Sequence, residues 1–336
     1  MYPNISVIIL NWNGWPDTIE CLESLYQINY PNFHVIVVDN HSVDDSIHQI
    51  KNFCNGELKV KSKFFDYNPN NKPITVFEYS SGEFKYSNQV KVLDSGKKLI
   101  IIKNDDNYGF AEGNNIGMRF VLENLDSDYV LLLNNDTVVQ RDFLSELVRC
   151  AILNPDAGIV GPKIFYYDKP NILNAAGGKI LWSVGAGLNI GMGEEDLGQY
   201  DKISKIDYLM GACLLINKAL IEKIGYMDKK FFLLHEETDF CIRAKKAGFK
   251  LILNPESTIY HKEGISGKPS PTKYYYMYRN RLLIIKKHQK PIKVLLYSLN
   301  ISLRTLMIIL YHTARGNTEI SKNILKGYIQ GINEIL

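Results

Sequence analysis

The chain has 336 residues, a hydrophobic content of 46%, a charged content of 22% and a formal net charge of +3. These values are ordinary for a globular protein with a real core, and the length fits one large domain with an appendage or two domains. The charge is uneven, because residues 1–259 carry 26 Lys and Arg against 33 Asp and Glu, whereas residues 260–336 carry 13 against 3. A tail with a net charge of +10 predicts contact with something anionic, although we expect no nucleic acid among the partners.

The five cysteines are scattered, odd in number and without C-x-x-C spacing. This pattern predicts neither a zinc site nor a disulfide framework, and it favours a reducing, cytoplasmic setting. The amino terminus enters an apolar run with no charged segment before it, so we expect no signal peptide. The sequence does not indicate an oligomeric state.

The first 55 residues have the pattern of a β-α-β unit. The expected elements are a strand at Ile5–Leu10, a turn at Asn11–Gly14, a helix from Asp17 to about Ile28, a strand at Phe33–Val38 ending in Asp39, and a helix from Asp44. This order implies a right-handed crossover and a parallel sheet.

Residues 55–97 interrupt this pattern with Lys, Asn, Ser and short alternating runs. We interpret them as an inserted β-hairpin region at the surface, with Ser81-Gly82 as the turn between Ile74–Tyr79 and Phe84–Tyr86. The sheet is expected to resume at Leu99–Lys103, followed by a polar loop and a helix from Glu112 to about Leu125.

The later elements complete an α/β class with a mostly parallel central sheet flanked by helices, over residues 1–270. They are strands at Val130–Leu133, Gly158–Lys163 and Leu251–Asn254, an apolar stretch at Tyr208–Asn217, and helices at Phe143–Leu153, Ala219–Ile224 and Thr238–Ala247. Residues 170–206 are Gly-rich and irregular, which predicts a loop over a binding cleft.

Residues 271–336 form a basic, aromatic and helical tail. Residues 292–313 are strongly apolar but contain Lys293 and Arg304. An Arg in the middle of a spanning helix costs roughly 2.5–3.5 kcal/mol, so a helix lying at a membrane surface fits better. A helix packed on the main domain or on a partner subunit explains the pattern equally well.

Short oxygen-bearing side chains follow the apolar strand at Val130–Leu133, in the order Asn134, Asn135, Asp136. A carboxylate with carboxamides at the carboxyl end of a buried strand suits a hard divalent cation that bridges phosphate groups. An Asx-rich turn is the alternative interpretation.

Two further acidic residues follow strands or lie in adjoining loops. Asp39 could accept hydrogen bonds from a base or ribose, or it could form an Asx turn. Asp106 precedes Gly109, and the glycines at 109, 113 and 117 do not form the G-x-G-x-x-G fingerprint. We expect these glycines to let a ligand approach and to let the helix pack close to the sheet, with Asn114 as a neutral hydrogen-bonding group.

Carboxylates also open the helix near residue 238, at Glu236, Glu237 and Asp239. They gain from the helix dipole, or one of them acts as a general base held near an acceptor hydroxyl. His261 follows the last predicted strand and could complete a metal site with Asp136, although a lone His is usually structural.

The order of these motifs resembles glycosyltransferase family 2, of the GT-A fold, and within it the rhamnosyltransferase-like branch that builds surface polysaccharides. The resemblance covers about residues 4–288 and is carried by seven segments in one order. They are Ser6–Gly14, Val37–Ser42, Asn107–Asn115, Leu132–Thr137, Gly211–Ile216, Glu236–Arg243 and Tyr278–Arg281.

The resemblance implies an inverting transfer from a nucleotide sugar to a hydroxyl, helped by Mg²⁺ or Mn²⁺. Glu237 falls at the position of the catalytic base, with Glu236 and Asp239 as the other candidates, and Asp136 and His261 would bind the metal. The residues implied in donor binding are Asn11, Asn13, Asp39, Asp106, Gly109, Asn114, Asn134 and Asn135. The donor would be dTDP-rhamnose or a UDP sugar, and the acceptor a saccharide or polyprenyl-linked saccharide at the cytoplasmic face of a membrane.

Two departures from the family pattern stand out. The D-x-D motif reads Asn134-Asn135-Asp136, which leaves a single carboxylate for the cation, and the base position holds Glu where Asp is usual. A nucleotidyltransferase is an alternative, but it would place basic residues after the first strand, and Asn11–Trp15 has none. A non-catalytic nucleotide-sugar-binding protein is a second alternative, and the retention of all the candidate residues argues against it.

Overall fold

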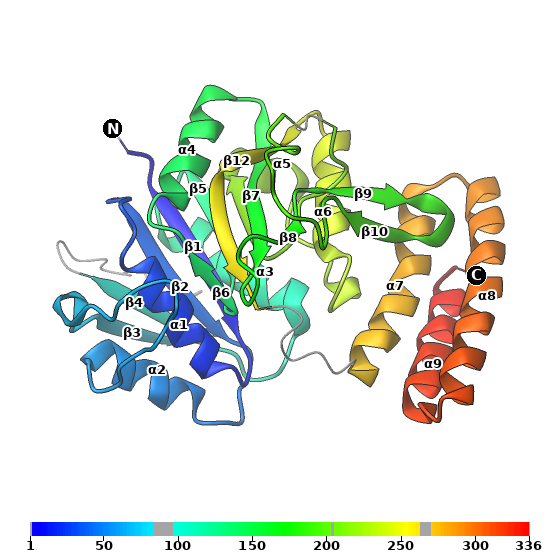
Figure 1. Ribbon diagram of the computed structural model, residues 1–336, viewed down its shortest axis with the longest axis horizontal. Helices are drawn as coiled ribbons and strands as arrows, with labels where there is room; N and C mark the ends of the chain where they lie inside the picture. The colour runs from blue at the N-terminus through cyan, green and yellow to red at the C-terminus, as the bar shows by residue number, and fades with distance from the viewer. Residues whose placement is uncertain (1, 83–96, 203–204, 263–269, 336) are drawn as a thin grey trace.

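The computed structural model describes residues 2–82, 97–202, 205–262 and 270–335 (Figure 1). A ten-stranded mixed sheet forms its centre, in the order β3-β4-β2-β1-β5-β11-β7-β12-β6, with β8 paired to β7. The strands are β1 (Ile5–Asn11), β2 (Phe33–Asp39), β3 (Thr75–Ser80), β4 (Lys98–Lys103), β5 (Tyr129–Asn134), β6 (Thr137–Val139), β7 (Ala157–Tyr166), β8 (Leu173–Ala175), β11 (Cys213–Asn217) and β12 (Lys250–His261).

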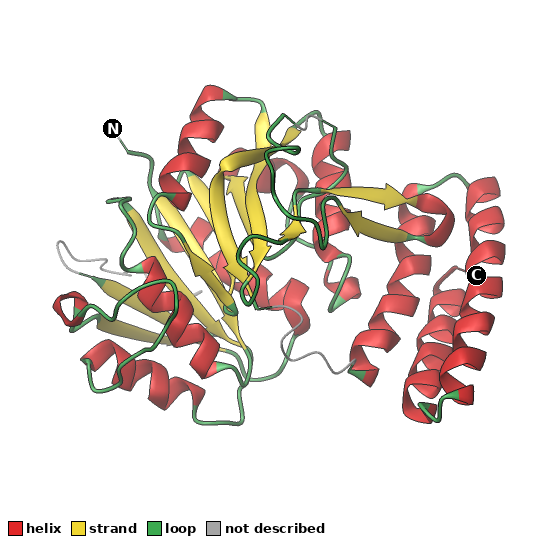
Figure 2. Ribbon diagram, in the orientation of Figure 1, coloured by secondary structure: helices red, strands yellow, loops and turns green. Residues whose placement is uncertain are grey.

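Helices cover both faces of the sheet (Figure 2). Because side chains alternate along a strand, Val7 and Ile9 of β1 face one apolar cluster and Ile8 faces the other. The first cluster includes α1 (Trp15–Leu25), α2 (Ser46–Asn55) and α4 (Phe143–Leu153), and the second includes α3 (Gly109–Asn124), α5 (Lys218–Ile224) and α6 (Glu236–Lys246). The predicted α/β class is therefore confirmed.

The glycines of α3 set the distance between this helix and the sheet. A Cβ atom at Gly113 would lie 2.5 Å from Leu10, and one at Gly117 would lie 2.7 Å from Ile8. Real Cβ atoms do not approach side chains so closely, so the prediction that these glycines let the helix pack against the sheet is confirmed.

Several segments differ from the sequence-based expectation. β11 runs antiparallel to both neighbours, β5 and β7, inside an otherwise largely parallel region. β3 belongs to the main sheet as an edge strand parallel to β4, and its expected hairpin partner at Phe84–Tyr86 lies outside the described residues.

The prediction of an irregular loop over residues 170–206 is wrong in part, because β8 and the hairpin of β9 (Gly178–Leu181) and β10 (Ala186–Asn189) lie there. The glycine-rich composition concealed these strands, which are only three or four residues long.

The tail consists of α7 (Pro271–His288), α8 (Pro291–Ala314) and α9 (Thr318–Ile335), which lie side by side at one end of the molecule (Figure 1). A third apolar cluster joins α7 and α8 to Phe231 and to Ile242 of α6. A Cβ atom at Gly327 of α9 would overlap the carbonyl of Tyr275 on α7, so these two helices meet at backbone distance. The tail is thus firmly packed on the sheet domain through α7.

Candidate active site

Polar side chains gather where the parallel strands end. β1 and β2 pair with Asn11 opposite Asp39, and β1 and β5 pair with Leu10 opposite Asn134. The carboxyl ends of these strands therefore lie at one edge of the sheet, and Asp136 comes two residues after β5. Ligands of open α/β sheets bind in the crevice beyond this edge.

Asp39 is buried and held in a fixed orientation. Its Oδ1 accepts hydrogen bonds from Asn11 Nδ2 (2.8 Å) and Ser42 Oγ (2.6 Å), and its Oδ2 accepts one from the Ser42 backbone N–H (3.0 Å). Asn11 Oδ1 in turn accepts from Thr18 Oγ1 at 2.7 Å. The turn interpretation and the ligand interpretation are thus compatible, because the turn itself orients the carboxylate. Ser42 and Thr18 belong to this network and were not predicted individually.

Asn13 connects the loop after β1 to the loop after β2. Its backbone adopts a left-handed φ of 50°, and its Oδ1 accepts from the backbone N–H groups of Val43 (2.8 Å) and Asp44 (3.2 Å). The side chain therefore holds together the two loops that follow β1 and β2 at this edge of the sheet.

The loop around Asp106 is organised by Asn40, which the sequence analysis did not single out. Asn40 Nδ2 donates to Asn107 Oδ1 (2.8 Å) and to the Gly109 carbonyl (3.1 Å), and Asn40 Oδ1 accepts from Asn104 Nδ2 (3.0 Å). Asp106 itself is exposed at the end of this loop. A buried Asn directly after a strand that ends at the site was the signal that could have identified Asn40.

The amino end of α3 meets the segment before α6. Gly109 has φ +75°, and a Cβ atom there would lie 2.6 Å from Phe232, so only glycine fits this close approach. Asn114, by contrast, is buried and donates to the Phe110 carbonyl of its own helix at 2.9 Å. This hydrogen bond lies within α3 and is typical of helix packing, so it gives no sign that Asn114 faces a bound donor.

Asp136 and His261 meet directly. β12 pairs with β6 so that His261 lies opposite Thr137, and His261 Nε2 is 3.2 Å from Asp136 Oδ1. His261 Nδ1 is 3.0 Å from Asn174 Oδ1. Burial alone would raise the pKa of the Asp136 carboxyl, but the hydrogen bond and charge of His261 outweigh burial and hold this pKa below its ordinary value.

The donor atoms of this pair suit a divalent cation. In the neutral ring, with the Nδ1 proton donated to Asn174, Nε2 presents a lone pair to the Asp136 oxygen, whereas in the charged ring Nε2 donates a proton to it. Two lone pairs at that distance attract only when a proton or a cation lies between them. Among the described residues, no group of three or more His, Cys, Asp or Glu side chains could hold a metal. Mg²⁺ sites commonly use few protein ligands and complete the coordination with substrate phosphates and water.

Asn134 and Asn135 support the same edge. The Asn134 carbonyl accepts from Thr137 Oγ1 at 2.7 Å, and Asn135 Nδ2 donates to Thr18 Oγ1 at 3.0 Å. A Cβ atom at Gly14 would lie 2.8 Å from Asn135 Nδ2, so the turn after β1 needs glycine for this approach. Asn135 therefore connects the turn after β1 to the Asp136 loop, and Asn134 connects the end of β5 to Thr137 at the start of β6.

Glu237 lies on the same side of the molecule as this edge. A Cβ atom at Gly211 would be 3.4 Å from Cβ of Glu237, so the Glu side chain lies against Gly211. The next residue, Ala212, accepts from the Asn134 backbone N–H at 2.9 Å. Glu237 is thus joined to the Asn134–Asp136 segment by two adjacent residues, and it is only partly buried.

Glu236 has a different environment. Its side chain is buried, and its Oε2 has no hydrogen-bond partner among the described residues. Burial, followed by the charge of Glu237, raises the pKa of Glu236 well above its ordinary range. The Glu236 carboxyl is enclosed by protein whereas Glu237 is only partly buried, so Glu237 is the better placed of the two to accept a proton from a hydroxyl.

Asp239 is fully buried among cations. Its oxygens lie 2.8 Å from Arg243 Nε, 2.9 Å from Lys287 Nζ and 2.7 Å from His288 Nε2. Burial alone would raise the pKa of Asp239, but the hydrogen bond from His288 and the charges of Arg243 and Lys287 lower it to about 2. These contacts make Asp239 an anchor between α6 and α7 rather than a base.

The segment before α6 is strained and held from α7. Phe232, Leu234 and His235 have φ values of 58°, 71° and 74°, a conformation that L-residues rarely adopt. Asn280 of α7 is buried, and its Nδ2 donates to the carbonyls of Phe231 (2.9 Å), Leu233 (2.9 Å) and Leu234 (2.7 Å). Strained backbone of this kind persists only where its surroundings determine it, and it is common at functional sites. The sequence analysis quoted Asn280 without assigning it a role.

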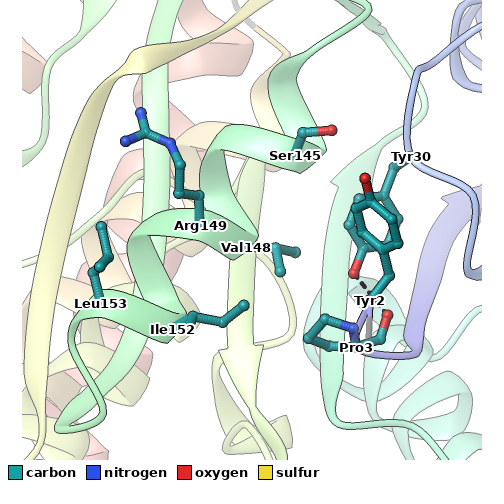
Figure 3. Close-up of a pocket in the computed structure, with 8 residues that line it drawn as sticks. All are labelled: Tyr2, Pro3, Tyr30, Ser145, Val148, Arg149, Ile152 and Leu153. Atoms are coloured by element: carbon teal, nitrogen blue, oxygen red, sulfur yellow. Dashed lines mark hydrogen bonds between the residues drawn. The ribbon is translucent and has the colours of Figure 1, made fainter.

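A pocket of about 370 Å³ lies away from this edge (Figure 3). It is lined by Tyr2 and Pro3, which precede β1, by Tyr30, which precedes β2, and by residues of α4 such as Arg149. These positions belong to the amino ends of the strands, so the pocket is separate from the candidate active site.

The fold and this edge define a glycosyltransferase of the GT-A fold. Residues 91–281 match the family described as glycosyltransferase like family 2, and residues 6–84 match glycosyl transferase family 2. The chain belongs to glycosyltransferase family 2, as its motifs predicted.

Individual proteins agree with this assignment. The chain is 26% identical over 212 residues to the low-salt glycan biosynthesis hexosyltransferase Agl10 of Haloferax volcanii, across 62% of this chain and 67% of that protein. It is 25% identical over 254 residues to the dTDP-rhamnosyl transferase RfbF of Shigella flexneri, across 71% and 80%. The mannosyltransferase PcManGT from Pyrobaculum calidifontis, in complex with GDP-Man and Mn²⁺, has a TM-score of 0.57 at 13% identity, across 99% of this chain and 88% of that one. The last likeness concerns the fold alone, and the relatives' names confirm the rhamnosyltransferase-like branch.

Proposed function

We propose that the protein transfers a sugar, with inversion, from a nucleoside-diphosphate sugar to a hydroxyl of a saccharide or lipid-linked saccharide. The observation that carries this proposal is the arrangement of the Asp136–His261 pair and Glu237 at one edge of the sheet, joined through Gly211 and Ala212. This arrangement offers one group for the leaving diphosphate and another for the attacking hydroxyl.

The donor is proposed to lie along the strand ends. Asp39, oriented by Asn11 and Ser42, would accept hydrogen bonds from the nucleoside, and Asp106 would contact the nucleotide or its ribose. Asp136 and His261 would hold Mg²⁺ or Mn²⁺, which when bound neutralises charge on the departing diphosphate.

The chemical step needs one displacement. The acceptor oxygen attacks the anomeric carbon as its proton passes to a Glu237 carboxylate oxygen, and the bond from the anomeric carbon to the diphosphate oxygen breaks with its electron pair on the diphosphate. A single attack from the face opposite the leaving group inverts the configuration. Asp239 and Asn280 would position the base helix without touching the substrate.

The first test is Glu237→Gln, which keeps the shape of the side chain and removes its basicity. We expect transfer to fall by about 10²–10⁴-fold while nucleotide-sugar binding, measured by calorimetry, stays nearly unchanged. Glu146→Gln on α4, a partly exposed Glu outside the site, serves as the matched control and should retain full activity. Full activity in Glu237→Gln would rule out this role.

The finer assignments rest on the family resemblance and on the named relatives. We propose dTDP-rhamnose or a UDP sugar as donor, a polyprenyl-linked or free saccharide of a cell-surface or cell-wall polysaccharide as acceptor, and a location at the cytoplasmic face of a membrane. We also propose residues 1–270 as the catalytic domain and 271–336 as an appended tail. A donor panel assayed with Mn²⁺ would identify the sugar, and silence with every donor despite binding would favour a non-catalytic protein.

A further inference from the structure

Exposed apolar side chains are concentrated on the tail. Within the described ranges, twenty large hydrophobic residues are exposed, and eleven of them lie on α8 and α9. Single exposed hydrophobic residues are normal on a protein surface, but a contiguous patch of this kind marks an interaction site.

Eight of the nine exposed large hydrophobic residues of α8 form one continuous stripe, and the ninth, Tyr311, lies beside it. The eight are Ile292, Leu295, Leu296, Leu299, Leu303, Leu306, Met307 and Leu310. Their spacing of three or four residues places them on one helix face roughly 120° wide, at about 100° per residue. The buried residues Ser298, Ile301 and Thr305 lie on the opposite side. Leu325 and Ile329 of the adjacent α9 are exposed as well.

The packed face of α8 argues against a helix that crosses a bilayer. Among the described residues, α8 is the one helix long and apolar enough to span a membrane by length and composition. However, Ser302 Oγ bonds Tyr328 of α9, Thr313 Oγ1 bonds Ser321 of α9, and Asn300 Nδ2 donates to the Ser183 carbonyl of the β9–β10 hairpin. These contacts hold one side of α8 against protein along its length, so lipid can reach only the other side.

The positive charges beside the stripe indicate which kind of partner binds it. Residues 271–314 contain no Asp or Glu, and Lys293 and Arg304 are exposed beside the stripe. A second copy of this chain would bring like charges together without acidic partners on α8, which is unfavourable. An anionic lipid surface offers both the apolar interior and the negative charge.

We propose that α8 and α9 lie on the surface of an anionic bilayer, with Leu299 and Leu303 central to the inserted face and Lys293 and Arg304 at the headgroups. This inference extends the proposed function, in which the acceptor is lipid-linked, but its test needs no sugar donor. Failure of transfer and failure of lipid binding are therefore distinguishable.

The experiment is co-sedimentation of the full-length protein with vesicles of phosphatidylcholine alone or with phosphatidylglycerol added. We expect binding to the anionic vesicles that weakens with salt, and at least a tenfold fall in binding for the double variant Leu299→Gln/Leu303→Gln. Ile152→Gln/Leu153→Gln on α4 makes the same change at similarly exposed positions and should bind like the wild type.

Three results would overturn the proposal. They are equal binding of the Leu299→Gln/Leu303→Gln variant, absence of wild-type binding to either vesicle, and sedimentation velocity that shows a dimer abolished by this variant. The last result would identify the stripe as an interface between copies. Unchanged thermal unfolding of the variant would show that its loss of binding does not come from misfolding.

Discussion

At the scale of single residues, the most informative contact is between Asp136 and His261. The pair lies 125 residues apart in the chain, yet the pairing of β12 with β6 brings the two side chains to 3.2 Å. Asn174 completes the arrangement by fixing the ring from its other nitrogen. Such partners orient a metal-binding imidazole and make it more basic.

This geometry predicts a graded effect on metal affinity. His261→Ala is expected to remove most Mn²⁺ affinity in the presence of a nucleoside diphosphate, and Asn174→Ala to weaken it by about 10–100-fold, because the ring loses its fixed orientation. Calorimetric titration of Mn²⁺ measures both effects. Asn55→Ala, at an exposed position of α2, is the control, and an unchanged affinity in His261→Ala would contradict the site.

At the scale of elements, α7 contacts both the segment that precedes α6 and α6 itself. Asn280 binds the strained residues before α6, and Lys287 and His288 bind Asp239 within it. α6, which carries the proposed base Glu237, is therefore positioned by the tail as well as by the sheet, and we expect changes in α7 to affect the proposed transfer.

Asp239→Asn is expected to destabilise the fold by roughly 2–5 kcal/mol at pH 7, because Arg243 and Lys287 lose the charge of the buried carboxylate that they contact. The folded pKa of about 2 lies below the ordinary value, so the stabilisation is present above about pH 4 and is lost as the pH falls toward 2. Urea unfolding of both proteins at several pH values measures the difference. This difference in the free energy of unfolding should shrink as the solution becomes more acidic. The control Asp126→Asn changes an exposed residue and should unfold like the wild type at every pH.

Asn280→Ala is expected to lower kcat at least tenfold with little change in the KM for the donor. The Asn280 amide donates to backbone carbonyls that precede α6, the helix that carries the proposed base Glu237. Asn280 has no part in the Asp39 network, where the donor is proposed to bind. Steady-state kinetics separate the two constants. A rise in the donor KM with kcat intact would contradict a positioning role, and Asn323→Ala on α9 is the matched control.

At the scale of the whole molecule, local patterns predicted the parts of the fold that depend on neighbouring residues. The β1-α1-β2 unit, β5, α4 and the polar strand ends follow from periodicity and from the apolar-to-polar change at Asn134. The orientation of β11 and the ion cluster at Asp239 depend on partners far along the chain. No short pattern encodes those partners, so Asp239 was grouped with the candidate bases, and Asn40 and Asn280 were given no role.

The reversed direction of β11 determines which parts of the chain meet at the carboxyl end of β5. Since β11 runs against β5, its beginning rather than its end lies at the carboxyl end of β5, and residues 190–212 connect it to β10. The residues that β1, β2 and β5 bring to this edge all precede residue 137, whereas the stretch that leads into β11 comes from another part of the chain. Substitutions in residues 190–212 can therefore change what lies beside Gly211 and Glu237 while the hydrogen bonds of Asp39 are kept.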